Sequence, residues 1–146
     1  MQVVTVFDPE HGVRTHQVTG VINMPAFQGI LKGLYTSKQF HTDMHALWDV
    51  RLADFSCITP EDVRDLMHVV VNNWGGPAGA CRCAILVASM AEFGVARTYM
   101  SQFGRAAPCA IRIFLELNEA RQWLGLGAGP GEAAPPSHQL DSKLGA

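Results

Sequence analysis

Two periodicities of apolar positions alternate along residues 1–124. Short runs rich in β-branched residues predict strands, and apolar residues that recur three and four positions apart predict helices. The predicted strands span residues 3–7, 13–19, 46–52, 83–87 and 110–115. Helices are predicted to follow Asn23, Thr59 and Ser89, and a last short helix is expected to end near Trp123 and Leu124. The predicted order of elements is ββαβαβαβα.

Local signals mark two of the helix starts. Thr59 is a favourable N-cap residue, and the acidic residues that follow it lie at the positive end of the helix dipole. A continuous apolar stripe over residues 63–74 then predicts a helix with one buried face. Ser89 and Glu92 have the spacing of a capping box, and the helix that they open is expected to end at Gly104.

The order of these elements predicts the fold class. Residues 8–12, Asp-Pro-Glu-His-Gly, have the composition of a turn and predict a hairpin between the first two strands. Strands that alternate with helices pair in parallel through right-handed crossovers. We therefore expect an α/β domain over residues 1–124, with a mixed sheet that combines an N-terminal β-hairpin and three further strands alternating with helices.

Residues 125–146 differ from the rest of the chain because they are rich in Gly, Pro and Ala. This composition predicts a disordered tail. Its alternating glycines do not match a dinucleotide-binding loop, because they follow a helix rather than a strand and are interrupted by Pro130.

Composition limits the class of protein. Of the 146 residues, 48% are hydrophobic and 16% are charged, which favours a packed core over disorder. The formal charge of −2 gives no general attraction to nucleic acid or to an anionic membrane. The apolar runs are too short for a transmembrane segment, and the N-terminus lacks the cationic region of a signal peptide. We expect a soluble, cytoplasmic protein.

No group of residues has the spacing of a known catalytic or metal site. The chain lacks a Gly-x-Ser-x-Gly nucleophile elbow and a phosphate-binding loop. His41 and His45 are four positions apart, but they precede a strand and have no third ligand nearby. The cysteines, at positions 57, 81, 83 and 109, lack Cys-x-x-Cys spacing, and reduced core thiols are favoured over a redox or metal pair. We expect no catalytic residue, no metal and no cofactor, and hence no enzyme.

Several stretches of sequence carry a resemblance to a known family. They are residues 47–51 (Leu-Trp-Asp-Val-Arg), 53–56 (Ala-Asp-Phe-Ser), 59–62 (Thr-Pro-Glu-Asp), 93–99 (Phe-Gly-Val-Ala-Arg-Thr-Tyr) and the closing residues 113–124. Together they resemble the SpoIIAA-like, STAS/CRAL-TRIO-related family of bacterial proteins, from about residue 3 to residue 124. The resemblance implies a STAS-like fold, but it implies little about function, because fold does not determine function.

The loop before the second predicted helix bears on regulation. Anti-sigma-factor antagonists of the wider STAS fold carry an Asp-Ser-Ser-Gly phosphorylation motif at this place. Here residues 55–61 are Phe-Ser-Cys-Ile-Thr-Pro-Glu, so the motif is absent although two hydroxyls remain. A protein-interaction switch phosphorylated at Ser56 or Thr59 is therefore an alternative hypothesis.

Candidate ligand contacts gather at one edge of the predicted sheet, because ligands of open α/β sheets bind beyond the carboxyl ends of the strands. Ser56, Thr59 and Ser89 supply hydroxyls there, and two of them lie at helix N-termini that favour anions. Capping by itself explains Thr59 and Ser89. Arg97 and Tyr99 follow on the next helix. A structural ion pair of Arg97 with an aspartate of the third strand is favoured over a ligand contact.

These residues lead to the first functional hypothesis, a non-catalytic binding or regulatory module. It would hold a small apolar or acidic amphipathic ligand between helix and sheet, with any acidic head at the helix N-termini. The hypothesis requires a cavity beside Phe93, Arg97 and Tyr99. A protein partner, or a homodimer formed through the hairpin or an exposed sheet edge, is a further possibility.

Overall fold

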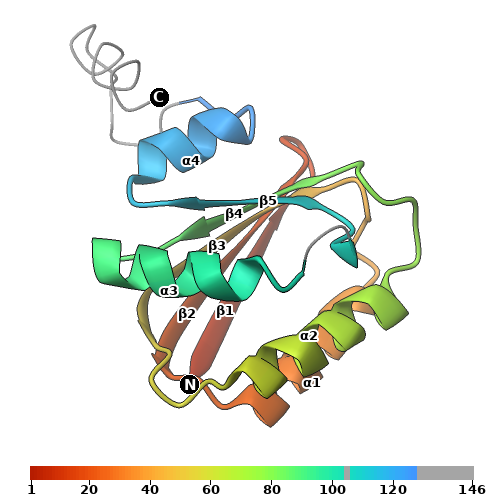
Figure 1. Cartoon of the computed structure of the whole chain (residues 1–146). Helices are drawn as coiled ribbons and strands as arrows, with labels where there is room; N and C mark the ends of the chain where they lie inside the picture. The colour runs from red at the N-terminus through yellow and green to blue at the C-terminus, as the bar shows by residue number, and fades with distance from the viewer. Residues whose placement is uncertain (104–105, 128–146) are drawn as a thin grey trace, which may run out of the picture.

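The computed structural model describes residues 1–103 and 106–127, which form a five-stranded sheet with helices on both faces (Figure 1). The predicted α/β class with a mixed sheet is confirmed. In chain order the elements are β1 (Gln2–Asp8), β2 (Val13–Val21), α1 (Met24–Tyr35), β3 (His45–Asp54), α2 (Pro60–Asn73), β4 (Arg82–Leu86), α3 (Met90–Met100), β5 (Ala110–Phe114) and α4 (Leu117–Trp123). Gly104, the expected end of a helix, and residues 128–146 of the expected tail lie outside the described residues.

Neighbouring strands of the sheet follow one another along the chain, in the order β1-β2-β3-β4-β5. β1 and β2 are antiparallel and form the expected hairpin, while each later pair is parallel. Gly12, in the hairpin turn, has a φ of 64°, a conformation that glycine adopts without steric cost. Because β2 pairs with strands on both sides, it lies inside the sheet rather than at its edge.

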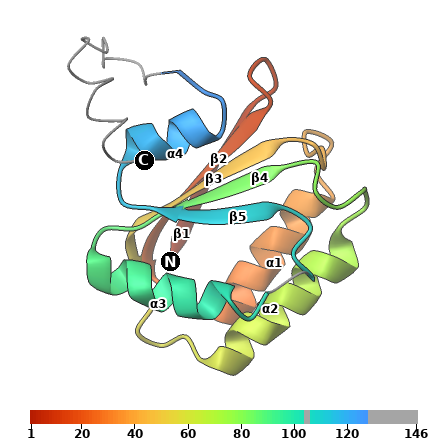
Figure 2. The ribbon, with the colours of Figure 1, turned by 45° about the horizontal axis from the view of Figure 1, so that its top comes forward.

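The two faces of the sheet are covered differently (Figures 1 and 2). The single helix α4 packs on one face over a tight cluster of buried residues, which are Val13, Leu47, Ala84, Leu86, Phe114, Ala120 and Leu124. Leu126, the second residue of the expected tail, also packs against this cluster. Helices α1, α2 and α3 lie on the opposite face.

The predicted N-caps Thr59 and Ser89 are confirmed, but Ser89 and Glu92 do not form the expected capping box. The Thr59 hydroxyl accepts a hydrogen bond from the Asp62 N–H, and the Asp62 carboxylate accepts one from the Thr59 N–H, at 3.1 and 2.9 Å. At α3, the Ser89 hydroxyl accepts from the Glu92 N–H at 3.2 Å. The Glu92 carboxylate accepts from the N–H of Ala88, one residue before the cap. These local bonds satisfy backbone donors that the helices themselves leave free.

One expectation about the cysteines is wrong, because Cys81 and Cys109 form a disulfide bond. Their Cα atoms are 5.0 Å apart, although 28 positions separate them in the sequence. Each cysteine immediately precedes a strand, and the parallel pairing of β4 with β5 brings the two strand starts together. Cys57 and Cys83 are free. Disulfide bonds are uncommon in the cytoplasm, so the cytoplasmic location stays a prediction.

Candidate ligand-binding cavity

A cavity of about 200 Å³ lies between the sheet and the three helices α1, α2 and α3. Its walls are formed by the apolar stripes of the helices, for example by Leu31 of α1, Leu66 of α2 and Met100 of α3. The same spacing that predicted each amphipathic helix thus places its apolar residues around one space. The three stripes meet the sheet without filling the volume between them.

The floor of the cavity is made by alternate residues of β2, β3, β4 and β5. The strand register places Arg14, Cys83 and Ile111 in one row and Trp48 and Ile85 in the next, with Val18 and Val50 beyond them, where the register of β2 and β3 shifts. The first row lies at the amino-terminal ends of the parallel strands. The cavity therefore spans the face of the sheet, from this row to Ile22 and Phe55 at the carboxyl ends of β2 and β3.

Tyr99 is the predicted site residue that lines this cavity. Its hydroxyl donates a hydrogen bond to the Ile58 carbonyl at 3.0 Å, in the loop before α2. Ile58 and Phe55 of the same loop also line the cavity. Tyr99 thus fixes α3 against this loop and closes one side of the cavity. Phe93, also expected beside a cavity, is partly buried and packs against the cluster on this face.

The other predicted site residues, Ser56, Thr59, Ser89 and Arg97, are exposed and do not line the cavity. The hydroxyls of Thr59 and Ser89 act as helix caps. Within residues 1–103 and 106–127, Arg97 forms no ion pair. Asp49, one of the aspartates of the third strand, is bound by Arg51 at 2.8 Å.

Phosphorylation at Ser56 or Thr59 stays a prediction. Ser56 is exposed, and its N–H donates to the Asp54 carboxylate at 2.8 Å. A phosphate at this place would face that negative charge, and one on Thr59 would displace the carboxylate of Asp62 from the cap. The N-terminus of α2 favours a phosphate on Thr59, whereas the nearby carboxylates of Asp54 and Asp62 oppose one.

Sequence reasoning missed Arg14, whose side chain lines the cavity and is only 4% exposed. Nη1 of Arg14 donates to the Met44 carbonyl at 3.4 Å, and the guanidinium lies 4.7 Å from the centre of the Phe40 ring. Burial lowers the pKa of the Arg14 guanidinium from its usual value. Its position on a strand gave no sufficient signal, since Arg51 of β3 and Arg82 of β4 also lie on interior strands and are exposed.

His16, two positions further along β2, is completely buried. Its ring stacks on Trp48 with centroids 3.9 Å apart, and Nδ1 lies 2.8 Å from the Thr5 hydroxyl. Nε2 has no hydrogen-bond partner in the described structure. Burial, together with the charge of Arg14, lowers the pKa of His16 to about 3. His16 is therefore uncharged at neutral pH.

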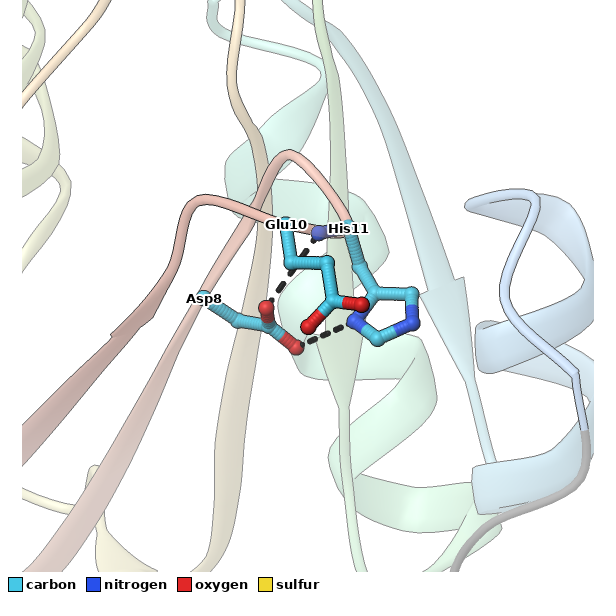
Figure 3. Close-up of side chains that lie close together, drawn as sticks. All are labelled: Asp8, Glu10 and His11. Carbon is cyan, nitrogen blue, oxygen red and sulfur yellow. Dashed lines mark hydrogen bonds and ion pairs between the residues drawn. The ribbon is translucent and has the colours of Figure 1, made fainter.

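A second cluster of titratable groups, Asp8, Glu10 and His11, lies at the hairpin tip (Figure 3). Its potential ligand atoms lie within 4.8 Å of one another. Nδ1 of His11 is 2.7 Å from the Asp8 carboxylate, which also accepts the His11 N–H at 3.2 Å. These bonds lower the pKa of Asp8. They are the bonds of a tight exposed turn, and turn formation accounts for the cluster.

Comparison of the sequence with protein-family models and with curated proteins finds no match. Within the part of the chain that the structure describes, the helices are too short or too polar to span a bilayer.

Proposed function

We propose that this protein is a non-catalytic binding module that holds a small apolar or amphipathic molecule in the cavity between the sheet and helices α1, α2 and α3. The observation that carries the proposal is the cavity itself, about 200 Å³ in volume and lined almost entirely by apolar side chains. Protein interiors are normally close-packed, so an unfilled space of this size needs a reason.

The volume sets the size of the ligand. An apolar cavity of roughly 150 Å³ stays dry and accepts benzene, so this one suits a molecule of roughly eight to ten non-hydrogen atoms. Burial of an apolar ligand there contributes roughly 25 cal/mol for each Å² removed from water. A STAS-like assignment is part of the proposal, and the mixed sheet with its N-terminal hairpin supports it.

The chemistry of the lining residues supports binding rather than catalysis. Cys83 is the free thiol that lines the cavity, and burial raises its pKa to about 11. The thiol is therefore protonated at neutral pH and is a poor nucleophile. His16 lies next to this row but is uncharged and engaged with Thr5 and Trp48. No nucleophile and base are thus paired along the described lining.

Isothermal titration calorimetry with 1-octanol as the ligand tests this proposal. We expect one molecule to bind, with a negative heat-capacity change because apolar surface is buried. Ala96 of α3 lines the cavity, so Ala96→Phe fills it and should weaken binding at least tenfold. Ala91 lies on the same helix but is exposed and outside the lining, so Ala91→Phe is the matched control and should bind like the unmodified protein.

Two results would contradict the proposal. One is the absence of 1-octanol binding to the unmodified protein. The other is equal affinity of the Ala96→Phe and Ala91→Phe proteins, because binding would then occur outside the cavity. Thermal unfolding of both variants shows whether the fold is retained.

A further inference from the structure

We propose that Arg14 anchors the head group of the ligand, so that the cavity takes a small monocarboxylic acid with an apolar body. This inference rests on the proposed function and names the class of ligand. It moves the acidic end of the ligand from the helix N-termini to the first row of the cavity floor, in which Ala46 of β3 separates Arg14 from Cys83 and Ile111.

The surroundings of Arg14 leave its charge without a counter-charge. A buried guanidinium is costly unless an acidic group pairs with it. Over residues 1–103 and 106–127, no carboxylate forms an ion pair with Arg14. Nε has no hydrogen-bond partner, and the bond to the Met44 carbonyl is long at 3.4 Å. The contact with the Phe40 ring offsets only part of the desolvation.

The titratable groups nearest to Arg14 cannot supply the missing negative charge. Burial raises the pKa of Tyr35 to about 12 and that of Cys83 to about 11. Both groups are therefore neutral at pH 7. His16, on the same face of β2, is also uncharged, so Arg14 is the one charged residue among those that line the described cavity.

A carboxylate bound in the cavity would complete this site. It would accept charge-assisted hydrogen bonds from the Arg14 guanidinium, including the unpartnered Nε. Tyr35 also lines the cavity, and its hydroxyl is protonated at pH 7, so it can act as a second donor. A single guanidinium matches one negative charge, which favours a monocarboxylate over a phosphate dianion.

The apolar part of the ligand would then follow the rows of the floor. From the row of Arg14 to that of Val18, β2 rises roughly 13 Å, at about 3.3 Å per residue. This stretch of the cavity is bordered by Trp48, Ile85 and Val50. A short unbranched or aromatic acid fits this arrangement, with its carboxylate at the amino-terminal row and its apolar end toward Val18.

Calorimetric titration at pH 7 with octanoate and with 1-octanol tests the inference, since the two molecules differ at the head group. We expect the unmodified protein to bind octanoate about 10- to 100-fold more tightly, the range for a hydrogen-bonded charge. Arg14→Met should lose this factor for octanoate and keep the affinity for 1-octanol. Tyr35→Phe should weaken octanoate binding less, by about 3- to 10-fold.

The matched control is Arg112→Met, because Arg112 is exposed and does not line the cavity. It should leave both affinities unchanged. Two results would overturn the inference about Arg14 and leave the proposed function intact. One is equal affinity of the unmodified protein for octanoate and 1-octanol, and the other is unchanged octanoate affinity in the Arg14→Met protein. If neither molecule binds, the proposed function fails as well. If the Arg14→Met protein does not fold, the ratio of the octanoate and 1-octanol affinities of the unmodified protein still tests whether the cavity binds a carboxylate.

Discussion

At the scale of single residues, two basic side chains lie on the same face of β2 and are almost fully enclosed. Arg14 is 4% exposed and His16 is not exposed at all. Desolvation disfavours the charged form of both side chains, and the positive charge of Arg14 further disfavours protonation of His16. The imidazole releases its proton, while the guanidinium keeps its own because its usual pKa is far higher. The pair therefore carries one positive charge.

The buried neutral state of His16 makes stability depend on pH. Its folded pKa of about 3 lies below the ordinary value of 6.5, so between these values the unfolded chain binds a proton that the folded chain does not. The free energy of unfolding is thus highest above about pH 6.5. It decreases as the pH is lowered from there toward 3, and this group contributes up to about 1.4 kcal/mol per pH unit. Urea denaturation at several pH values measures the slope.

The comparison of His16→Gln with His68→Gln isolates this effect, because His68 is exposed. The window from roughly pH 5 to pH 6.5 is suitable, since the carboxylates with lowered pKa, Asp8, Asp49 and Asp54, titrate below it. We expect His16→Gln to reduce the slope and His68→Gln to retain it, since burial also lowers the pKa of His45 and its contribution is present in both variants. An identical slope in both variants would show that His16 is protonated in the folded state.

Arg14 should lower the stability of the ligand-free protein. Replacement of a buried charged group by an apolar residue of similar volume often stabilises a protein, by about 1–4 kcal/mol for buried pairs. We therefore expect Arg14→Met to raise the free energy of unfolding in urea, whereas the exposed Arg112→Met changes it by no more than about 0.5 kcal/mol. A less stable Arg14→Met protein would show that the guanidinium has a structural partner.

At the scale of elements, the helices on the cavity face are fixed by contacts of two kinds. Hydrogen bonds close in sequence, such as those of the Thr59 cap, determine where a helix begins. Contacts distant in sequence, such as that between Tyr99 and Ile58, determine where the helix lies. The cap residues therefore support the cavity without lining it.

Thr59→Ala should remove the reciprocal cap of α2 and lower the free energy of unfolding by about 1 kcal/mol. Ser56→Ala, three positions earlier, is the matched control and should change it by no more than about 0.5 kcal/mol. Urea denaturation measures both effects. The affinity for 1-octanol should remain the same in each variant. A loss of affinity in the Ser56→Ala protein would show that the ligand contacts Ser56, outside the described cavity lining.

At the scale of the whole molecule, the disulfide bond joins the starts of two parallel strands beside the cavity. Cys109 lines the cavity, and Cys81 is 2% exposed. The bond closes a loop that contains β4 and α3, so the unfolded chain loses conformational freedom when it forms. The segment that contains α3 is therefore held at the sheet by the disulfide bond between its two ends.

For a sequence separation of 28, the chain-entropy relation gives a stabilisation of about 3–4 kcal/mol. The double variant Cys81→Ser/Cys109→Ser should lose this amount in urea denaturation, whereas Cys57→Ser, at an exposed free cysteine, should lose little. Alkylation of the denatured, unreduced protein should label Cys57 and Cys83 and leave the other two unmodified. Labelling of all four cysteines would show that the bond is absent.

Much of the secondary structure could be predicted from the sequence, because its signals are local. The N-cap of Thr59, the apolar stripe of residues 63–74 and the turn at residues 8–12 each act within a few positions. The site was harder to predict. Tyr99 lines the cavity as expected, but Ser56 and Arg97 are exposed outside it, and Phe55 and Ile58, on either side of Ser56 in the chain, line the cavity in its place.

The sequence by itself thus determined the elements and the mixed α/β class, since capping and periodicity depend on neighbouring residues. Only the tertiary structure decided which charges are buried and which cysteines meet. Arg14 is enclosed because β2 lies inside the sheet beneath three helices, and Cys81 reaches Cys109 because β4 and β5 pair in parallel. These outcomes depend on strand order and register, which bring together residues that are distant in the sequence.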